Sequence, residues 1–331
     1  MLRHPLQFLR KTLAPAQPLR RLPALDEVLP WVLPKVRPRF AHEALSLEAW
    51  EPAPAFRPMA GALAVSLVLD LPYAELDLTA AMLQAWGADF DVLLQRARQN
   101  LLRRGGEEGF LAEGRGRFRS DWTDSLDGSR LLLPGVLRRL PLLGEPVAVL
   151  PSRDTLLVTG DQDPEGLQWL LTAALHLMGG DAGPKNASPL RLRHLRWEPF
   201  GSRDPRLRPL LERLRGRRLE DEYRRQKALL DRRHHFQGRT VTLAPFALEP
   251  AQGGRTASYT AWSPAMGEAW LPEADQVRLA WVRDREPGRA LVPFARMLER
   301  LPDLLEPVGL FPERYRFRQQ PGPRQLEALV A

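Results

Sequence analysis

The 331-residue chain contains no cysteine. Disulfide bonds, thiolate metal ligands and a cysteine nucleophile are therefore excluded from its chemistry. Long apolar runs are also missing, since no stretch approaches the roughly 18 consecutive apolar residues that a membrane-spanning helix needs. Charges and prolines interrupt residues 1–33, which lack the apolar core of a signal peptide. These absences predict a cytoplasmic protein that has no membrane partner.

Lysine is scarce as well: the 48 basic residues comprise 44 arginines and four lysines. The net charge of +8 is local, because residues 191–239 carry 16 basic and 7 acidic side chains while the rest of the chain is close to neutral. Apolar residues make up 44% of the sequence, enough for a buried core in each of two domains at this length.

Strand and helix patterns alternate irregularly along the chain, which predicts an α+β fold with mixed sheets. Frequent prolines in residues 1–58 predict a proline-rich arm. Residues 59–204 are expected to form a first α+β domain. Residues 205–331 are expected to form a second α+β domain, which opens with a basic helical segment split into two helices at Gly216.

Local signals mark several elements. The apolar run 61–72 predicts a strand, and residues 290–301 predict a final helix. Thr79, Asp89 and Asp163 precede helical patterns as N-cap residues. Gly87 and Gly105 are expected to end the first two of these helices, and a further helix is expected over residues 129–140.

A Leu-Pro-x-x-Asp sequence occurs at residues 150–154 and again at 271–275. Each copy is followed by a strand pattern and by an acidic residue with proline, the start of a helix, which in the second copy is Glu286-Pro287. Because aspartate side chains bond nearby backbone N–H groups in tight turns, Asp154 and Asp275 are predicted to be structural. The pattern fits an internal repeat and equally a chance similarity in a chain rich in Leu and Pro.

The richest polar cluster is SDWTDSLDGSR, residues 120–130. Paired carboxylates beside a serine could serve acid–base chemistry. The alternative is a turn and helix start whose acids favour the positive end of the helix. Arg153 joins the cluster as a candidate because the structural role in its turn falls to Asp154. The candidate catalytic residues are Asp121, Asp124, Asp127, Ser129, Arg130 and Arg153.

Three blocks in order, residues 70–101, 124–134 and 144–170, resemble the YtpQ-like bacterial proteins, a family of unknown function. The resemblance covers about residues 60–200. Within DSLDGSR, Asp127, Ser129 and Arg130 match the family's aromatic-Asp-Ala-Ser-Arg pattern, while the residues before and after Asp127 depart from it. The resemblance implies a cytosolic α+β protein and no particular reaction.

The basic segment, taken as a helix, places one set of arginines opposite an apolar face of Leu219, Tyr223 and Leu230. Such a basic face could track phosphates. Acidic residues one turn earlier favour ordinary intrahelical ion pairs instead. The arginines of this candidate binding face are Arg217, Arg224, Arg225 and Arg232.

Phosphate-loop, dinucleotide-binding, nucleophile-elbow and zincin motifs are missing from the sequence. Adjacent His234 and His235 would point about 100° apart on a helix, so no metal site and no cofactor are predicted. The missing motifs and the two α+β units favour a non-enzymatic interaction or adaptor protein whose partner is another protein. An enzyme built on the polar cluster, and a non-specific nucleic-acid binder using residues 205–239, are the alternatives.

Overall fold

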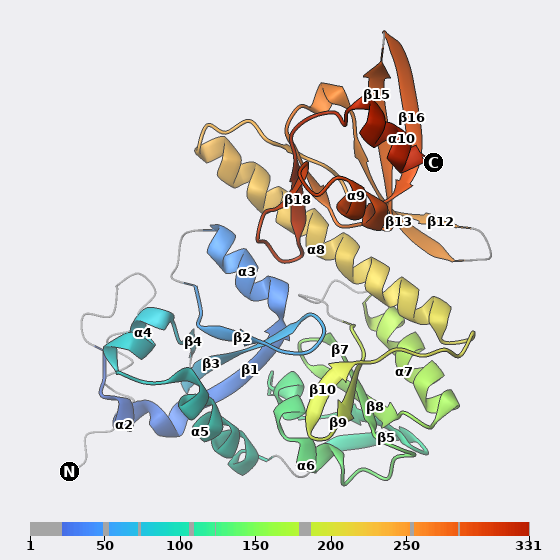
Figure 1. The fold of residues 1–331 in the computed structure, drawn as a ribbon. Coiled ribbons are helices and arrows are strands. Elements are labelled where there is room, and N and C mark those ends of the chain that lie inside the picture. Colours follow the sequence, from blue (N-terminus) through green and yellow to red (C-terminus); the bar gives the residue numbers. More distant parts are fainter. Residues whose placement is uncertain are drawn as a thin grey trace. The chain divides into compact units, whose positions relative to one another are not determined.

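The computed structural model places the chain as two compact units, one of Met1–Leu45 with Glu51–Phe200 and one of Ser46–Trp50 with Gly201–Ala331 (Figure 1). Helices combine with antiparallel and mixed sheets, which confirms the predicted α+β class. The structure describes residues 22–48, 53–71, 74–105, 109–122, 124–178, 187–251, 255–283 and 285–330.

The first sheet of the first unit is built on the predicted apolar strand, β3 (Leu63–Leu71). It pairs with β1 (Val32–Pro38) on one edge, and with β2 (Phe56–Pro58) and β4 (Ala74–Asp77) on the other. The expected proline-rich arm therefore supplies two strands of this sheet, together with α2 (Leu25–Val28), the 3₁₀ helix η1 (Leu29–Trp31) and α3 (Arg39–Glu48). Residues 1–21 of that arm lie outside the described residues.

Prolines fit into β1 because this strand lies at the edge of its sheet. The Val36 amide donates to Ser129 Oγ at 3.1 Å, so Val36 faces away from β3. Peptide groups alternate between the two edges of an antiparallel strand, so Pro34 and Pro38 share the outward edge with Val36. Two of these three positions have no N–H to satisfy, and Ser129 satisfies the third.

The second sheet is antiparallel with the strand order β10-β9-β7-β8-β6-β5. Its strands in chain order are β5 (Phe110–Gly114), β6 (Arg117–Ser120), β7 (Pro146–Ser152), β8 (Thr155–Gly160), β9 (Leu190–Arg193) and β10 (Arg196–Pro199).

Helices α4 (Ala80–Ala85), α5 (Phe90–Arg103) and α7 (Pro164–Leu177) begin as predicted, since Thr79, Asp89 and Asp163 each accept a first-turn N–H. The helix expected over residues 129–140 is instead the 3₁₀ helix η2 (Asp127–Leu132) followed by α6 (Pro134–Leu137). The break has a local cause, because proline disfavours the helical conformation of the residue before it.

The second unit opens with one continuous helix, α8 (Arg208–Phe236). The predicted break at Gly216 is wrong. A Cβ at Gly216 would lie 3.0 Å from Leu248 Cδ2, so the glycine lets the helix approach a strand closely. Packing against β12 favours glycine at position 216, and the packed helix tolerates the poor helix propensity of glycine.

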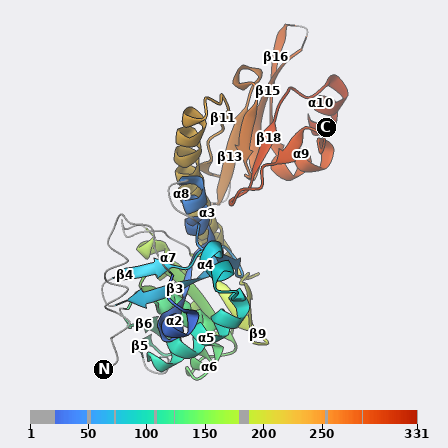
Figure 2. The same ribbon diagram turned by 90° about the vertical axis from the view of Figure 1, so that its left-hand side faces the viewer.

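Two four-stranded sheets follow α8. One has the order β11-β14-β18-β17 and the other β12-β13-β15-β16. Figure 2 shows α8 on one side of these strands and α9 and α10 on the other. The elements are β11 (Thr242–Leu243), β12 (Ala247–Pro250), β13 (Thr256–Trp262), η4 (Pro264–Met266), β14 (Ala269–Pro272), β15 (Gln276–Arg283), β16 (Glu286–Pro293), α9 (Phe294–Arg300), β17 (Leu305–Pro307), β18 (Arg314–Phe317) and α10 (Pro323–Val330).

The internal repeat is not confirmed. In the first copy β7 and β8 pair with each other, whereas in the second copy β14 and β15 belong to different sheets. Glu286-Pro287 begins strand β16 rather than a helix, so the final predicted helix starts only at Phe294. The Trp281 ring lies against Gly288 across the β15–β16 hairpin, a cross-strand contact that favours the strand over a helix.

Candidate functional site

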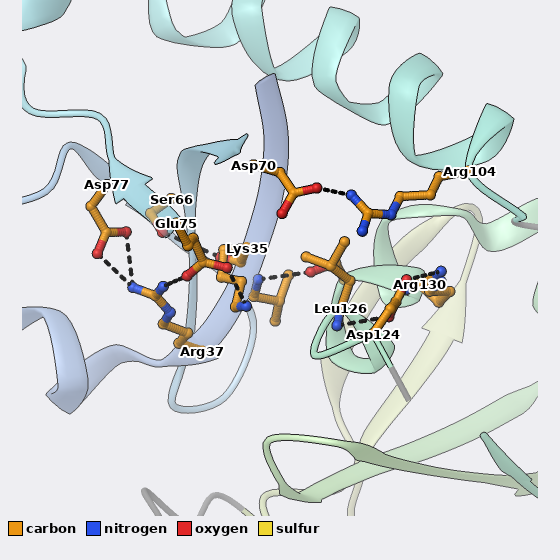
Figure 3. Close-up of polar contacts among 12 residues, drawn as sticks. Lys35, Arg37, Ser66, Asp70, Glu75, Asp77, Arg104, Asp124, Leu126 and Arg130 are labelled. Carbon is orange, nitrogen blue, oxygen red and sulfur yellow. Dashed lines mark hydrogen bonds and ion pairs between the residues drawn. The ribbon is translucent and has the colours of Figure 1, made fainter. Parts of the chain in front are cut away.

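The predicted polar cluster lies on and before η2, beside β1 (Figure 3). Asp124 accepts two hydrogen bonds of 2.8 Å from the Arg130 guanidinium, which is fully buried. The Trp122 ring covers this guanidinium at 4.5 Å. Burial by itself would raise the pKa of Asp124, but Arg130 and the Leu126 amide hold it below its usual value. Asp124 and Arg130 therefore form a closed ion pair within the fold.

Asp127 and Ser129 are both buried in η2. Burial raises the pKa of Asp127, the nearby Ser120 hydroxyl opposes the rise, and the charge of Asp124 adds to it. Within the described part of the chain, no hydrogen bond of ordinary geometry reaches either Asp127 oxygen. Ser129 Oγ accepts the Val36 amide and is enclosed. Both side chains are only 1% exposed, so the cluster does not present a nucleophile and a base to solvent.

A second network, which the sequence did not point to, lies on the polar face of the first sheet (Figure 3). Lys35 Nζ contacts Glu75 Oε2 at 2.7 Å, although Lys35 is only 4% exposed. Arg37 contacts Glu75 at 2.5 Å and Asp77 at 2.9 Å. The strand period of two places Lys35 and Arg37 on one face. This alternation is the sequence signal for the network, and it applies only once residues 32–38 are known to form a strand.

A small pocket of about 40 Å³ separates this network from the polar cluster. It is lined by residues 35–38 of β1, by Ser125, and by Leu150, Ser152 and Arg153 of the β7–β8 hairpin. Arg153 is exposed and makes no hydrogen bond or ion pair with a described residue. The structure thus brings Arg153 close to Ser125 of the cluster, while Asp121 is exposed and does not line this pocket.

Asp154 and Asp275, the two aspartates predicted to be structural, differ in their hydrogen bonding. Asp154 is exposed and its carboxylate has no hydrogen-bond partner among the described residues. Asp275 Oδ2 accepts the Ser258 amide and hydroxyl, both at 2.8 Å. Asp275 therefore joins its turn to strand β13.

The four arginines of the candidate basic face all interact within the fold. Arg224 and Arg225 contact Asp221 at 2.5 and 3.7 Å, and Arg232 lies 3.9 Å from Glu48. Arg217 also has a partner. Phosphates would have to compete with these contacts.

A larger pocket of about 490 Å³ lies in the second unit. One wall is α8, with Arg215, Gly216 and Leu219. The other walls are β12, the start of β13, and the turn of residues 273–276 between β14 and β15. No sequence motif indicates this pocket, because its walls come from segments that are brought together only by the fold.

The start of β13 presents an unpaired strand edge to this pocket. Ser258 N–H faces Asp275, so Ser258 and, by alternation, Thr256 point their peptide groups away from β12. Strand β15 begins at Gln276, opposite Tyr259, and no described strand lies beside Thr256 on that edge. The Thr256 N–H and C=O are therefore left for a ligand or water.

Charges of both signs line this pocket. On α8, Arg215 is exposed and has no described partner, whereas Glu212 pairs with Arg255 at 2.8 Å. That hydrogen bond from Arg255 is the main reason that the pKa of Glu212 is lowered. On the turn, Glu273 and Asp275 are exposed. The pocket thus offers a free cation on one wall and carboxylates on another.

Arg314 holds this unit together and was missed by sequence reasoning. Its fully buried guanidinium donates to Gln226 Oε1 at 2.6 Å and to the carbonyls of Ala244 and Trp270 at 2.9 and 3.1 Å. Burial lowers its pKa to about 10. These bonds join α8 to β14 and β18, and so fix the helix that forms one wall of the pocket.

No family model matches this chain, and searches of curated proteins and of solved structures also find no match. Within the described ranges, no helix is both long and apolar enough to cross a membrane. The same ranges contain no group of three or more His, Cys, Asp or Glu side chains able to hold a metal ion.

Proposed function

We propose that the protein is a non-enzymatic binding protein, and that its second unit holds an extended peptide segment of a partner protein. The observation that carries this proposal is the unpaired edge of β13 at Thr256, which faces a pocket of about 490 Å³. A peptide can add to such an edge as a further strand, with backbone hydrogen bonds supplying affinity. The volume lies within the range usual for ligand sites.

The walls of the pocket suit a peptide that carries both charges. Arg215 would bind an acidic side chain or a terminal carboxylate, and Glu273 with Asp275 would bind a basic group. Leu219 and Leu248 offer apolar contacts between these ends. Side-chain pockets beside a bound strand provide specificity, which an adaptor requires.

The alternatives are less well supported by the geometry. Asp124 is engaged by Arg130, and Asp127 and Ser129 are enclosed, which argues against an enzyme that uses the polar cluster. The basic face is already engaged within the fold, which argues against non-specific nucleic-acid binding. A cytoplasmic location and the likeness to YtpQ-like proteins are part of the same proposal.

A peptide selection tests the proposal. Short random peptides displayed on phage are selected against the full-length protein, and the dissociation constants of the enriched sequences are measured by fluorescence anisotropy. Arg215→Gln should weaken binding about tenfold, the effect of losing one charge-assisted hydrogen bond. Ala274→Phe should also weaken it, because the larger side chain fills the pocket.

Arg213→Gln is the matched control, because Arg213 is exposed on the same helix and does not line the pocket. It should leave the dissociation constant unchanged. Failure to enrich any peptide, or equal affinity for the Arg215→Gln and Arg213→Gln proteins, would contradict the proposed function.

A further inference from the structure

We propose that the small pocket of the first unit is a binding site for a phosphoryl group. Three segments distant in sequence meet there: β1, the loop before η2, and the β7–β8 hairpin. Three donors that line the pocket have no partner among the described residues, the hydroxyls of Ser125 and Ser152 and the guanidinium of Arg153. Donors left unpaired in one pocket are suited to binding an acceptor.

The charge of the pocket fits an anion. Its charged lining residues are all cations, namely Lys35, Arg37 and Arg153. Lys35 and Arg37 are balanced by Glu75 and Asp77, so Arg153 supplies the charge that remains uncompensated at the pocket. Asp154 follows Arg153 in the hairpin, but it does not line the pocket.

The closed ion pair of the polar cluster has a role in this site. Ser125 adopts the left-handed conformation, with φ of 59°, which is uncommon for a residue other than glycine. Asp124 accepts the Leu126 amide at 2.9 Å across this residue, and Arg130 fixes Asp124. Asp124 and Arg130 are therefore positioning residues, which hold Ser125 at the edge of the pocket.

Size and shape favour a phosphoryl group. The volume of about 40 Å³ leaves room for one small group and excludes a nucleotide base with its sugar. The three unpaired donors, one from the loop before η2 and two from the β7–β8 hairpin, can each meet one oxygen of a tetrahedral group, whereas a carboxylate offers two oxygens in a plane. The group can be free phosphate or a phosphomonoester whose remaining oxygen points to solvent.

Titration of the full-length protein with inorganic phosphate, followed by amide NMR at constant ionic strength, tests this inference. The amides of Ser125, Ser152 and Arg153 should shift with a saturable curve, and sodium chloride should not reproduce it. Arg153→Gln should raise the dissociation constant about tenfold. Ser125→Gly should also raise it while keeping the fold, because glycine is favoured at this φ.

Arg115→Gln is the control, since Arg115 is exposed in the turn of another hairpin and lines no part of this pocket. Its affinity for phosphate should equal that of the wild type. Parallel titrations with O-phosphoserine and with acetate distinguish the ligands: binding of O-phosphoserine points to a phosphomonoester, and its failure points to free phosphate. Equal affinity for acetate, or phosphate binding that survives Arg153→Gln, would overturn the inference.

Discussion

Single buried polar residues stabilise the fold by hydrogen bonds to segments that are distant in sequence. Ser129, part of a candidate catalytic cluster in the sequence, satisfies an edge amide of β1. Arg314, which sequence reasoning passed over, joins a helix to two strands. A sequence shows which residues are polar, but their burial depends on distant segments. For this reason the polar cluster could be located from the sequence, whereas the roles of its members could not.

Asp127 gives a prediction about charge. Its folded-state pKa is raised, mainly by burial, so its ionised form costs stability as the pH rises through that pKa. Asp127→Asn should therefore increase the free energy of unfolding near neutral pH by about 1 kcal/mol, the scale of an unsatisfied buried polar group. Urea unfolding of both proteins checks this, and the gain should shrink in acid. A loss of stability at neutral pH would contradict the role assigned to burial.

Arg314→Met should destabilise the second unit by about 3 kcal/mol, because it leaves several buried acceptors without a donor. Arg316→Met is the control on the same strand. Arg316 is partly exposed and pairs with Glu268 and Glu306, so its loss should cost less than about 1 kcal/mol. Equal losses in denaturant unfolding would show that Arg314 is an ordinary strand residue.

At the level of elements, local chemistry was a good guide to where helices begin and a poor guide to how strands pair. The caps at Thr79, Asp89 and Asp163 were predictable because each acts within one turn. The sheet position of β14 and the continuity of α8 depend on partners far along the chain, whereas β16 pairs with β15, the strand just before it. The pocket of the second unit was unpredictable for the same reason.

The contact between α8 and β12 gives a prediction. Gly216→Leu should destabilise the second unit by about 2 kcal/mol, since the new side chain has to displace Leu248. In a Leu248→Ala background the same substitution should cost much less, because space has been made and leucine is the better helix former. Additive effects of the two substitutions in urea unfolding would refute this packing role.

The basic face of α8 leads to a prediction about how binding to nucleic acid depends on salt concentration. Four free arginines would produce a log–log slope of binding to single-stranded DNA against salt of about −3. Because each of the four already has a partner in the fold, we expect weak binding and a clearly shallower slope. Replacement of all four by Gln should change that slope little. Tight binding that these substitutions abolish would favour the nucleic-acid alternative.

For the molecule as a whole, buried titratable groups in the two units predict opposite responses to pH. In the first unit, burial and Arg37 lower the pKa of His42 from 6.5 to about 4. In the second, burial raises the pKa of Glu222 from 4.5 to about 7, although Arg218 opposes the rise. The first unit should therefore lose stability as the pH falls below about 6.5, and the second should lose stability as the pH rises from about 4.5 to about 7.

The direction of each pH effect on stability follows from the difference between the folded and unfolded pKa values of the group. His42 contributes stability that is complete above pH 6.5 and is lost as the pH falls toward 4. The difference corresponds to about 3 kcal/mol. His42→Leu should reduce the acid sensitivity of the first unit, measured by denaturant unfolding with a probe in that unit. Unchanged acid sensitivity would show that His42 is not buried in its neutral form.

Glu222 contributes stability that is complete below pH 4.5 and is lost as the pH rises through about 7. Glu222→Gln keeps a side-chain acceptor for Arg218 and removes the titration. The variant should therefore reduce the loss of stability in the second unit between pH 4.5 and 7, measured with a probe in that unit. An identical pH profile for variant and wild type would contradict this.

The central claim, that a peptide adds to the edge of β13, is tested most directly by amide hydrogen exchange at Thr256. In the free protein, Thr256 should exchange quickly because no strand partner accepts its N–H, whereas Ser258 should exchange slowly because Asp275 accepts its N–H. Saturation with a selected peptide should slow exchange at Thr256 and leave that at Ser258 almost unchanged. Rapid exchange at Thr256 in the saturated complex would contradict strand addition at this edge.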